Sequence, residues 1–281
     1  MKKGHWSPEE HEYLRNHYTK DGSINVGKFL NRSHRAVGCM ARYLGLKRGW
    51  GNKPRYRKYA VNDQVFKTWS RVSAYLIGAI LADGNIGERE FNIVSKDENW
   101  LKKIKSALKS EHPISVFTGQ NTYRLRIGNK SMVNDLKSIG LTENKSKTLT
   151  LPDVPDRFFF DFLRGYIDGD GSIWYRPKKS LIIKITTGSP YILDDLSDTI
   201  TKLLGIERHA PSVCVQKRHQ GISTWYNLTY CGNCAANICE ALYSNSSDLC
   251  LTRKKHAFLS YKNRSKRDER SKGNASKYYS D

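Results

Sequence analysis

Two aspartates, Asp83 and Asp170, occupy equivalent positions in a repeated segment and are the best candidates for chemistry in this chain. The first copy of the segment reads YLIGAILADG and the second reads FLRGYIDGDG. In each copy a glycine, Gly78 or Gly165, stands five residues before the aspartate. Both copies have the apolar character of a buried helix that ends in an Asp-Gly pair. The duplication therefore predicts two matching helices, each with a carboxylate at its end.

Small residues favour close packing of these two helices. Ala82 and Gly169 each stand four residues after the glycine of their own segment, so each helix has a small-residue stripe along one face. Helices that pack along such stripes bring their carboxyl ends together. Two adjacent carboxylates repel each other unless a divalent cation lies between them, and hard oxygen ligands suit magnesium. We therefore expect a Mg²⁺ site at the two aspartates, which Mn²⁺ or Ca²⁺ could also occupy.

At these motifs the chain resembles the LAGLIDADG homing endonucleases, in the single-chain form that carries two motifs. The resemblance covers about residues 70 to 260. It implies an α+β fold, built as a pseudo-twofold duplication of an αββαββα unit with antiparallel DNA-binding sheets. It also implies that Asp83 and Asp170 are catalytic metal ligands, each helped by the main-chain carbonyl of the preceding residue, Ala82 or Gly169.

A basic residue near the site distinguishes the two halves. Lys96, which follows the strand FNIVS, matches the place where members of this family put a residue that organises water or stabilises the transition state. We expect a catalytic role for Lys96, with a surface lysine at a helix start as the alternative. The aligned position in the second half is Gly188. The first motif has Leu81 where the second has Asp168, so we leave Asp168 out of the catalytic set.

The segments after the two motifs support the duplication because both are typical of two strands, a helix, two strands and a helix. After a short turn, the first half is expected to have strands at 91–95, 113–119 and 122–128 and helices at 98–110 and 131–140. The second half is expected to have strands at 172–177, 180–188, 211–218 and 223–230 and helices at 190–205 and 232–244.

Alternation along the expected strands places polar side chains on the sheet face away from the helices. Arginine, glutamine and asparagine can contact base edges in the major groove, where a two-stranded ribbon fits. The candidate DNA contacts on the two sheets are Arg124, Arg126, Gln216, Arg218, Asn227 and Thr229. A solvated sheet face is the alternative for any one of them, since most protein–DNA contacts go to the DNA backbone.

Basic residues exceed acidic ones by 48 to 27, which gives a formal net charge of +21 on 281 residues. The excess is concentrated at the two ends. Residues 1–70 hold 15 basic and 5 acidic residues, and residues 253–281 hold 10 and 3. This distribution predicts phosphate contacts outside the cleavage site and DNA binding that weakens steeply with salt.

Residues 1–46 are typical of a small three-helix domain. The segment SPEEHEY begins with a capping box and has proline at the first helical position, while Ser23 and Ser33 can cap a second and a third helix. Arg35 and Arg42 would lie on the outer face of the third helix. The segment resembles the Myb/SANT-like helix-turn-helix modules, which implies that the third helix enters the major groove. A three-helix scaffold without DNA contacts is the alternative.

Basic segments are expected to flank the duplicated region. In the linker at 47–70, Arg55 and Arg57 are candidates for phosphate or minor-groove contacts, with a solvated linker as an equal alternative. The expected parts of the chain are a helix-turn-helix domain at 1–46, the basic linker at 47–70, a first half at 71–150, a second half at 151–260, and a basic tail at 261–281 that is disordered until bound.

The six cysteines do not make a convincing metal site. Cys231 and Cys234 have zinc-like spacing, but a complete site would also need Cys239 and Cys250. The expected helix at 232–244 would instead use its cysteines as small apolar side chains. No signal peptide or membrane-length apolar run is found. We therefore expect reduced thiols, no membrane partner, and a location in the cytoplasm or nucleoid of a bacterial or phage-infected cell, or in an organelle.

By resemblance, the chain is expected to act as a monomer and to be a site-specific, Mg²⁺-dependent DNA endonuclease, a hydrolase that makes a double-strand break and promotes insertion of its own mobile intron. Its partner would be an extended double-stranded DNA target. Two other functions stay open. One is an RNA-binding intron maturase on the same fold, and the other is a DNA-binding regulator with an inactive nuclease core.

Overall fold

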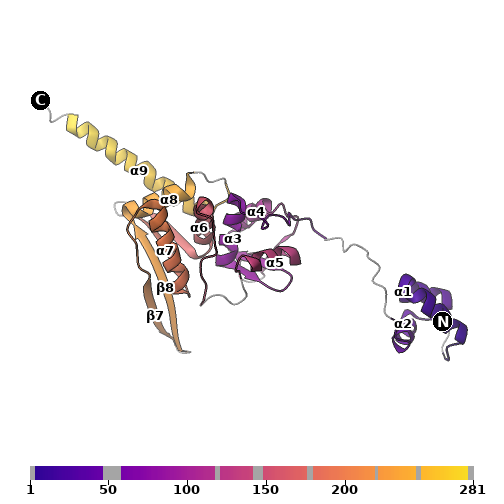
Figure 1. The fold of residues 1–281 in the computed structure, drawn as a ribbon. Coiled ribbons are helices and arrows are strands. Elements are labelled where there is room, and N and C mark those ends of the chain that lie inside the picture. The colour runs from indigo at the N-terminus through magenta and orange to yellow at the C-terminus, as the bar shows by residue number, and fades with distance from the viewer. Residues whose placement is uncertain are drawn as a thin grey trace. The chain divides into compact units, whose positions relative to one another are not determined.

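The computed structural model describes residues 4–46, 58–117, 121–141, 148–175, 180–218, 221–244 and 248–277. The chain divides into two compact units, Met1–Lys58 and Tyr59–Asp281, which are described separately (Figure 1). Of the helices in these ranges, none combines the length and the apolar character needed to cross a membrane.

The N-terminal unit contains two helices by hydrogen bonding, α1 (Pro8–Leu30) and α2 (His34–Tyr43). Gly22 has a left-handed φ of 71° inside α1 and breaks it into two segments, so the unit has the three helical segments that the sequence predicts. The break falls one residue before Ser23, where the second helix was expected to start. The capping box at the start of α1 is confirmed, because Ser7 accepts from the Glu10 amide and the Glu10 carboxylate accepts from the Ser7 amide.

A small core and one buried ion pair hold this unit together. Arg32 donates to the Glu10 carboxylate at 2.7 Å, and its guanidinium lies 4.3 Å from the centre of the Trp6 ring. Ser33 caps α2 by accepting from the Ala36 amide. The apolar side chains that form the core are Trp6, Leu14, Val26, Leu30, Val37 and Ala41.

The first half of the second unit begins with α3 (Arg71–Asp83) and follows the predicted order of elements, except that a short strand forms at Gly84–Ile86, where a turn was expected. Its strands are β1 (Gly84–Ile86), β2 (Phe91–Ser95), β3 (Ile114–Phe117) and β4 (Thr122–Ile127), and its other helices are α4 (Glu98–Ala107) and α5 (Lys130–Ser138). The strands form an antiparallel sheet in the order β1-β2-β4-β3.

The second half repeats this order of elements. A short 3-10 turn (Asp156–Phe158) leads into α6 (Phe159–Asp170), and α7 (Pro190–Leu204) and α8 (Gly232–Tyr243) cover one face of the sheet. The strands are β5 (Gly171–Tyr175), β6 (Leu181–Thr187), β7 (Ser212–Arg218) and β8 (Gly221–Cys231). Their order, β5-β6-β8-β7, matches that of the first sheet, so the predicted α+β duplication with two antiparallel sheets is confirmed.

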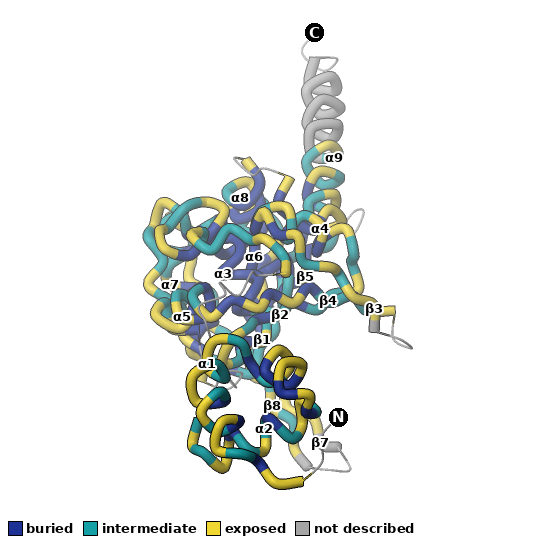
Figure 2. The backbone as a smooth tube through the Cα atoms, turned by 90° about the vertical axis from the view of Figure 1, so that its right-hand side faces the viewer, coloured by how far each residue is buried: buried dark blue, intermediate teal, exposed yellow. Residues whose placement is uncertain are grey.

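Helices α3 and α6 form the centre of the unit and are coloured as buried in Figure 2. The alternating residues of the sheets pack on them and on α4 and α7, which explains why both helices are apolar over most of their surface. One core therefore runs through both halves.

Two expectations about the flanking segments differ from the structure. Residues 59–70, expected as linker, pack on the first half: Phe66 is buried in contact with Phe91, and the Asn62 amide donates to the Leu108 carbonyl. Apolar residues in that stretch bury surface that a free linker would expose. Residues 261–277, expected to be disordered, continue α9 (Thr252–Lys277), whose first turns are anchored by buried side chains such as Phe258.

Candidate active site

The carboxyl ends of α3 and α6 meet. A Cβ added to Gly169 would stand 2.4 Å from the Ala82 Cβ and 3.3 Å from the Asp83 Cγ, so only glycine allows the two helix ends to approach this closely. Gly165 likewise contacts Tyr75, about two turns earlier in α3. Because contacts advance along both helices in the same direction, Asp83 and Asp170 leave the pair at the same end.

Burial makes an ionised carboxylate at this end of the helices costly in free energy. Burial raises the pKa of the Asp83 carboxyl, and the positive charge of Lys254 acts in the opposite direction. The negative charges of Asp168, Asp83 and Asp170 all act on Lys254. The structure therefore brings the three carboxylates into the field of one buried lysine.

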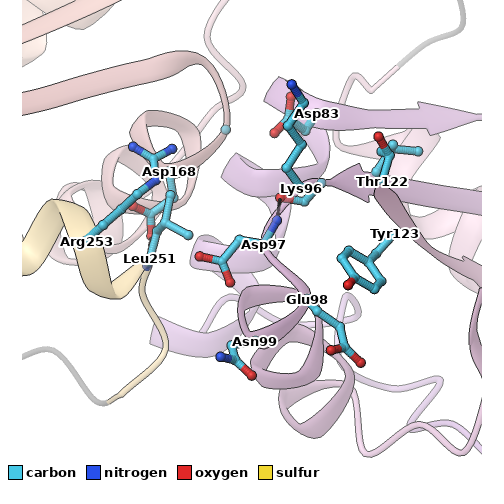
Figure 3. A pocket seen from close by; sticks show the side chains of 13 residues that line it. Asp83, Lys96, Asp97, Glu98, Asn99, Thr122, Tyr123, Asp168, Leu251 and Arg253 are labelled. Atoms are coloured by element: carbon cyan, nitrogen blue, oxygen red, sulfur yellow. Dashed lines mark hydrogen bonds between the residues drawn. The ribbon is translucent and has the colours of Figure 1, made fainter. Parts of the chain in front are cut away.

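A pocket of about 670 Å³ opens at Asp83 (Figure 3). Lys96, which the sequence assigned to catalysis, is exposed and lines the same pocket, directly after β2. Asp97 follows it and caps α4 by accepting from the Trp100 amide at 2.9 Å. The remaining lining residues are Val94, Ser95, Glu98, Asn99, Thr122, Tyr123, Asp168, Gly169, Leu251 and Arg253.

Asp168 joins the two halves through a chain of buried hydrogen bonds. Its Oδ2 accepts from the Tyr75 hydroxyl at 2.7 Å and from the Leu251 amide at 2.8 Å. The Tyr75 hydroxyl in turn accepts from the Trp100 Nε1 at 2.6 Å. Burial raises the pKa of the Asp168 carboxyl, while these two donors favour its ionised form. Asp168 thus links α6 to α3 and α4, a role that the sequence analysis did not assign to it.

Lys254 is a second residue that the sequence analysis missed. It is fully buried at the start of α9, and its Nζ donates to the main-chain carbonyls of Ile167 at 2.5 Å, Gly171 at 2.6 Å and Asp168 at 2.9 Å. Burial lowers its pKa to about 8. The sequence held one usable signal, because position 254 falls at helical spacing between Leu251, just before α9, and Phe258 within it.

The two sheets do not present all of the expected DNA contacts. Arg126 is exposed and donates to the Glu90 carboxylate at 2.5 Å, while Arg124 is half-buried. Gln216 and Thr229 are exposed, and the Arg218 side chain lies outside the described residues. The Arg126 guanidinium is therefore already engaged by Glu90.

Asn227, which was expected to contact DNA, is instead buried in the sheet. It is only 5% exposed, accepts from the Thr186 hydroxyl at 2.7 Å and donates to the Cys214 Sγ at 2.8 Å. The alternation that placed Asn227 on the outer sheet face was right, but neighbouring side chains on that face cover it. A base could not reach its amide without breaking both bonds, so Asn227 belongs to the sheet structure.

In the N-terminal unit, Arg35 and Arg42 are exposed on α2, as predicted. Arg55 and Arg57 lie outside the described residues. Across the part of the chain that the structure describes, no group of three or more histidine, cysteine, aspartate or glutamate side chains could hold a metal ion. Any cation at Asp83 would therefore need main-chain or water oxygens as well.

Residues 159–240, which run from the start of α6 into α8, match the model of the LAGLIDADG-like domain. This is the segment that contains the second Asp-Gly motif and its sheet. No curated protein matches the sequence of the chain.

Several solved structures are similar to this chain. A structure of I-DmoI in complex with DNA and Ca is 18% identical over 70% of this chain and 99% of that one, with a TM-score of 0.44. The I-WcaI homing endonuclease bound to its DNA recognition sequence is 15% identical over 74% and 95% of the two chains, with a TM-score of 0.43. The I-LtrWI LAGLIDADG homing endonuclease bound to target DNA is 17% identical over 64% and 86%, with a TM-score of 0.40.

Proposed function

We propose that this chain is a site-specific DNA endonuclease that makes a double-strand break by metal-dependent phosphodiester hydrolysis. The observation that carries the proposal is the contact of Asp83 with Gly169, which joins the ends of two duplicated helices at a pocket. The LAGLIDADG-like domain match over 159–240 supports the same assignment for the second half.

The oxygen donors at the helix ends fit a hard divalent cation such as Mg²⁺. Asp83 and Asp170 would hold it, together with the main-chain carbonyls of Ala82 and Gly169. Burial raises the pKa of Asp83, which makes its charge costly alone and favours a positive partner. When bound, the cation lowers the pKa of a coordinated water and stabilises charge on the oxygens of the scissile phosphate.

Lys96 is placed to act on the scissile phosphate or on the attacking water. It is exposed and lines the pocket of Asp83, so its ammonium can approach a phosphate or orient a water molecule there. Gly188 takes the aligned place in the second half, and therefore the two halves are not chemically equivalent. We infer that the two strands are cut at different rates.

The two sheets would provide the main DNA-binding surface. One chain contains both halves, so a monomer can place one site on each strand of a duplex. Arg124, Arg126, Gln216 and Thr229 lie on the two sheets and are the candidate contacts there, and the net charge of +21 supports a polyanionic partner. The exposed Arg35 and Arg42 on α2 extend the proposal to the N-terminal unit, which would act as a helix-turn-helix module.

The experiment is selection from a library of randomised duplexes with the full-length chain and Mg²⁺, followed by cleavage of the recovered site. Asp83→Asn and Asp170→Asn should each abolish double-strand cutting but keep DNA affinity within about tenfold, because the carboxylates hold metal rather than phosphate. Glu88→Gln, at an exposed acid outside the pocket, is the matched control. DNA binding by the wild-type chain with no cutting of any library member would instead indicate a regulator with an inactive nuclease core.

A further inference from the structure

Lys254 contributes a buried cation to the end of α6 from outside the duplicated units. We propose that Lys254 is a positioning residue of the nuclease site, which fixes the main chain that carries Gly169 and Asp170. The inference rests on the proposed function, because the position that it fixes is that of the metal-binding oxygens. Within the described residues, no helix corresponding to α9 follows α5 of the first half, and the buried lysine is found at the second half.

The hydrogen bonds of Lys254 account for its full donor capacity. A lysine ammonium has three protons, and Nζ has three carbonyl acceptors, on Ile167, Asp168 and Gly171. The last carbonyls of a helix lack partners within the helix, and α6 ends at Asp170. A cation there also interacts favourably with the helix dipole. With all three protons engaged and no exposure, Lys254 is not placed to contact DNA.

The three acceptors bracket the residues proposed to bind metal. Ile167 and Asp168 precede Gly169 and Asp170, and Gly171 follows them. One ammonium therefore joins the last turn of α6 to the first residue of β5. Metal ligands must be held within fractions of an ångström, and fixing the backbone on both sides of a ligand restricts it in that way.

The start of α9 is itself held by both halves of the duplication. The Leu251 amide donates to Asp168 Oδ2, and Lys103 of α4 donates to the Cys250 carbonyl at 3.0 Å and to the Thr252 hydroxyl at 2.9 Å. These contacts place Lys254 by reference to α6 in one half and α4 in the other. The C-terminal helix is thereby built into the site.

The charge of Lys254 and its hydrogen bonds should affect metal affinity in opposite directions, so replacing Lys254 tests which effect is larger. A positive charge near Asp83 and Asp170 repels a divalent cation, so its removal alone would tighten metal binding. Loss of a positioning bond would weaken metal binding because the ligands would no longer be held in place.

The test measures Mn²⁺ binding to the full-length chain by isothermal titration calorimetry. Lys254→Met should weaken Mn²⁺ affinity at least fivefold although it removes a positive charge, whereas Lys255→Met, the same change at the adjacent position, should leave affinity within about twofold. Unchanged or tighter binding by Lys254→Met would overturn the inference. Circular dichroism checks that each variant is folded.

Lys254→Gln is the second variant, for the case in which Lys254→Met does not fold. Its amide keeps two donors and is also neutral, so weaker Mn²⁺ binding than wild type again supports positioning, and equal or tighter binding overturns it. Asp83→Asn and Asp170→Asn separate the two ideas. If these variants bind Mn²⁺ as the wild type does, the proposed metal site is wrong. If they lose Mn²⁺ and the Lys254 variants do not, only the positioning role is wrong.

Discussion

Gly78 and Gly165 pack reciprocally, each against the backbone of the opposite helix. A Cβ at Gly78 would stand 2.1 Å from the Phe162 carbonyl oxygen, and a Cβ at Gly165 would stand 2.0 Å from the Tyr75 carbonyl oxygen. Backbone atoms inside a helix cannot move aside as a side chain can. These two glycines therefore set the separation of α3 and α6, and with it the approach of the two helix ends.

The first prediction concerns this close approach. Gly78→Ala should lower the free energy of unfolding by at least about 2 kcal/mol, because the added methyl group forces the two helices apart. Urea unfolding followed by circular dichroism measures the change. Gly128→Ala is the control, since a Cβ there meets no atom within 4 Å, and it should stay within about 0.5 kcal/mol of wild type. Equal stability of the two variants would contradict the packing.

Local patterns predicted the elements well because those elements follow local rules. Alternation located β4 and β8, and serine capping located α1 and α2. The equal spacing of Gly78 and Gly165 from their aspartates predicted the central helix pair. In that pair, the glycines that make the repeat visible in the sequence are also the residues that let the two helices touch.

The parts of the site that the sequence did not reveal depend on contacts between distant segments. Lys254 bonds to residues more than 80 positions earlier, and nothing in a basic C-terminal segment distinguishes it from its neighbours except its helical spacing from apolar residues. Asn227 lies on the predicted face, but strand alternation cannot show that Thr186 and Cys214 occupy its amide. Alternation predicts on which face of the sheet a residue lies. Whether neighbouring side chains bury it depends on tertiary packing.

The second prediction concerns the bond between Tyr75 and Asp168. Tyr75→Phe should cost about 1–3 kcal/mol of unfolding free energy, since it leaves the buried Trp100 indole without its acceptor and removes a donor to Asp168. Tyr191→Phe, at an exposed tyrosine, should have little effect. A double-mutant cycle with Asp168→Asn, measured by urea unfolding, should give a coupling energy clearly above zero. Additive effects would show that the bond contributes nothing.

The third prediction compares two polar residues of the sheets, Asn227 and Arg126. Asn227→Ala should lower thermal stability and leave the DNA affinity of the folded protein nearly unchanged, because its amide is engaged within the sheet. Arg126→Ala should do the reverse, since its exposed pair with Glu90 adds little stability. Melting curves and fluorescence anisotropy with the selected duplex measure the two effects. An Asn227→Ala variant of normal stability but weak DNA binding would restore Asn227 as a DNA contact.

The fourth prediction tests the N-terminal unit. Arg32→Met should unfold this unit alone, because it removes the buried guanidinium that pairs with the Glu10 carboxylate, a change that costs about 3–5 kcal/mol. If the unit binds DNA, the DNase I footprint of the variant should be shorter at one end while cleavage at the central site persists. Arg35→Ala, at an exposed position, should keep the unit folded and weaken binding with a smaller salt dependence. A footprint of full length with Arg32→Met would reject the helix-turn-helix role.

The fifth prediction concerns the inequality of the two halves. Lys96→Ala should slow the chemical step by about 100-fold or more, because it removes a lysine that lines the pocket of Asp83, while DNA affinity changes little. Single-turnover kinetics with each strand labelled should show the larger loss on one strand, since Gly188 already lacks a side chain at the aligned position. Nicked DNA would then accumulate before the double-strand break.

Lys102→Ala, at an exposed lysine of α4 that pairs with Glu98, provides the matched control and should cut both strands normally. Equal slowing of both strands would mean that Lys96 acts through binding of the whole duplex, and wild-type rates would reduce it to a surface lysine at the start of α4.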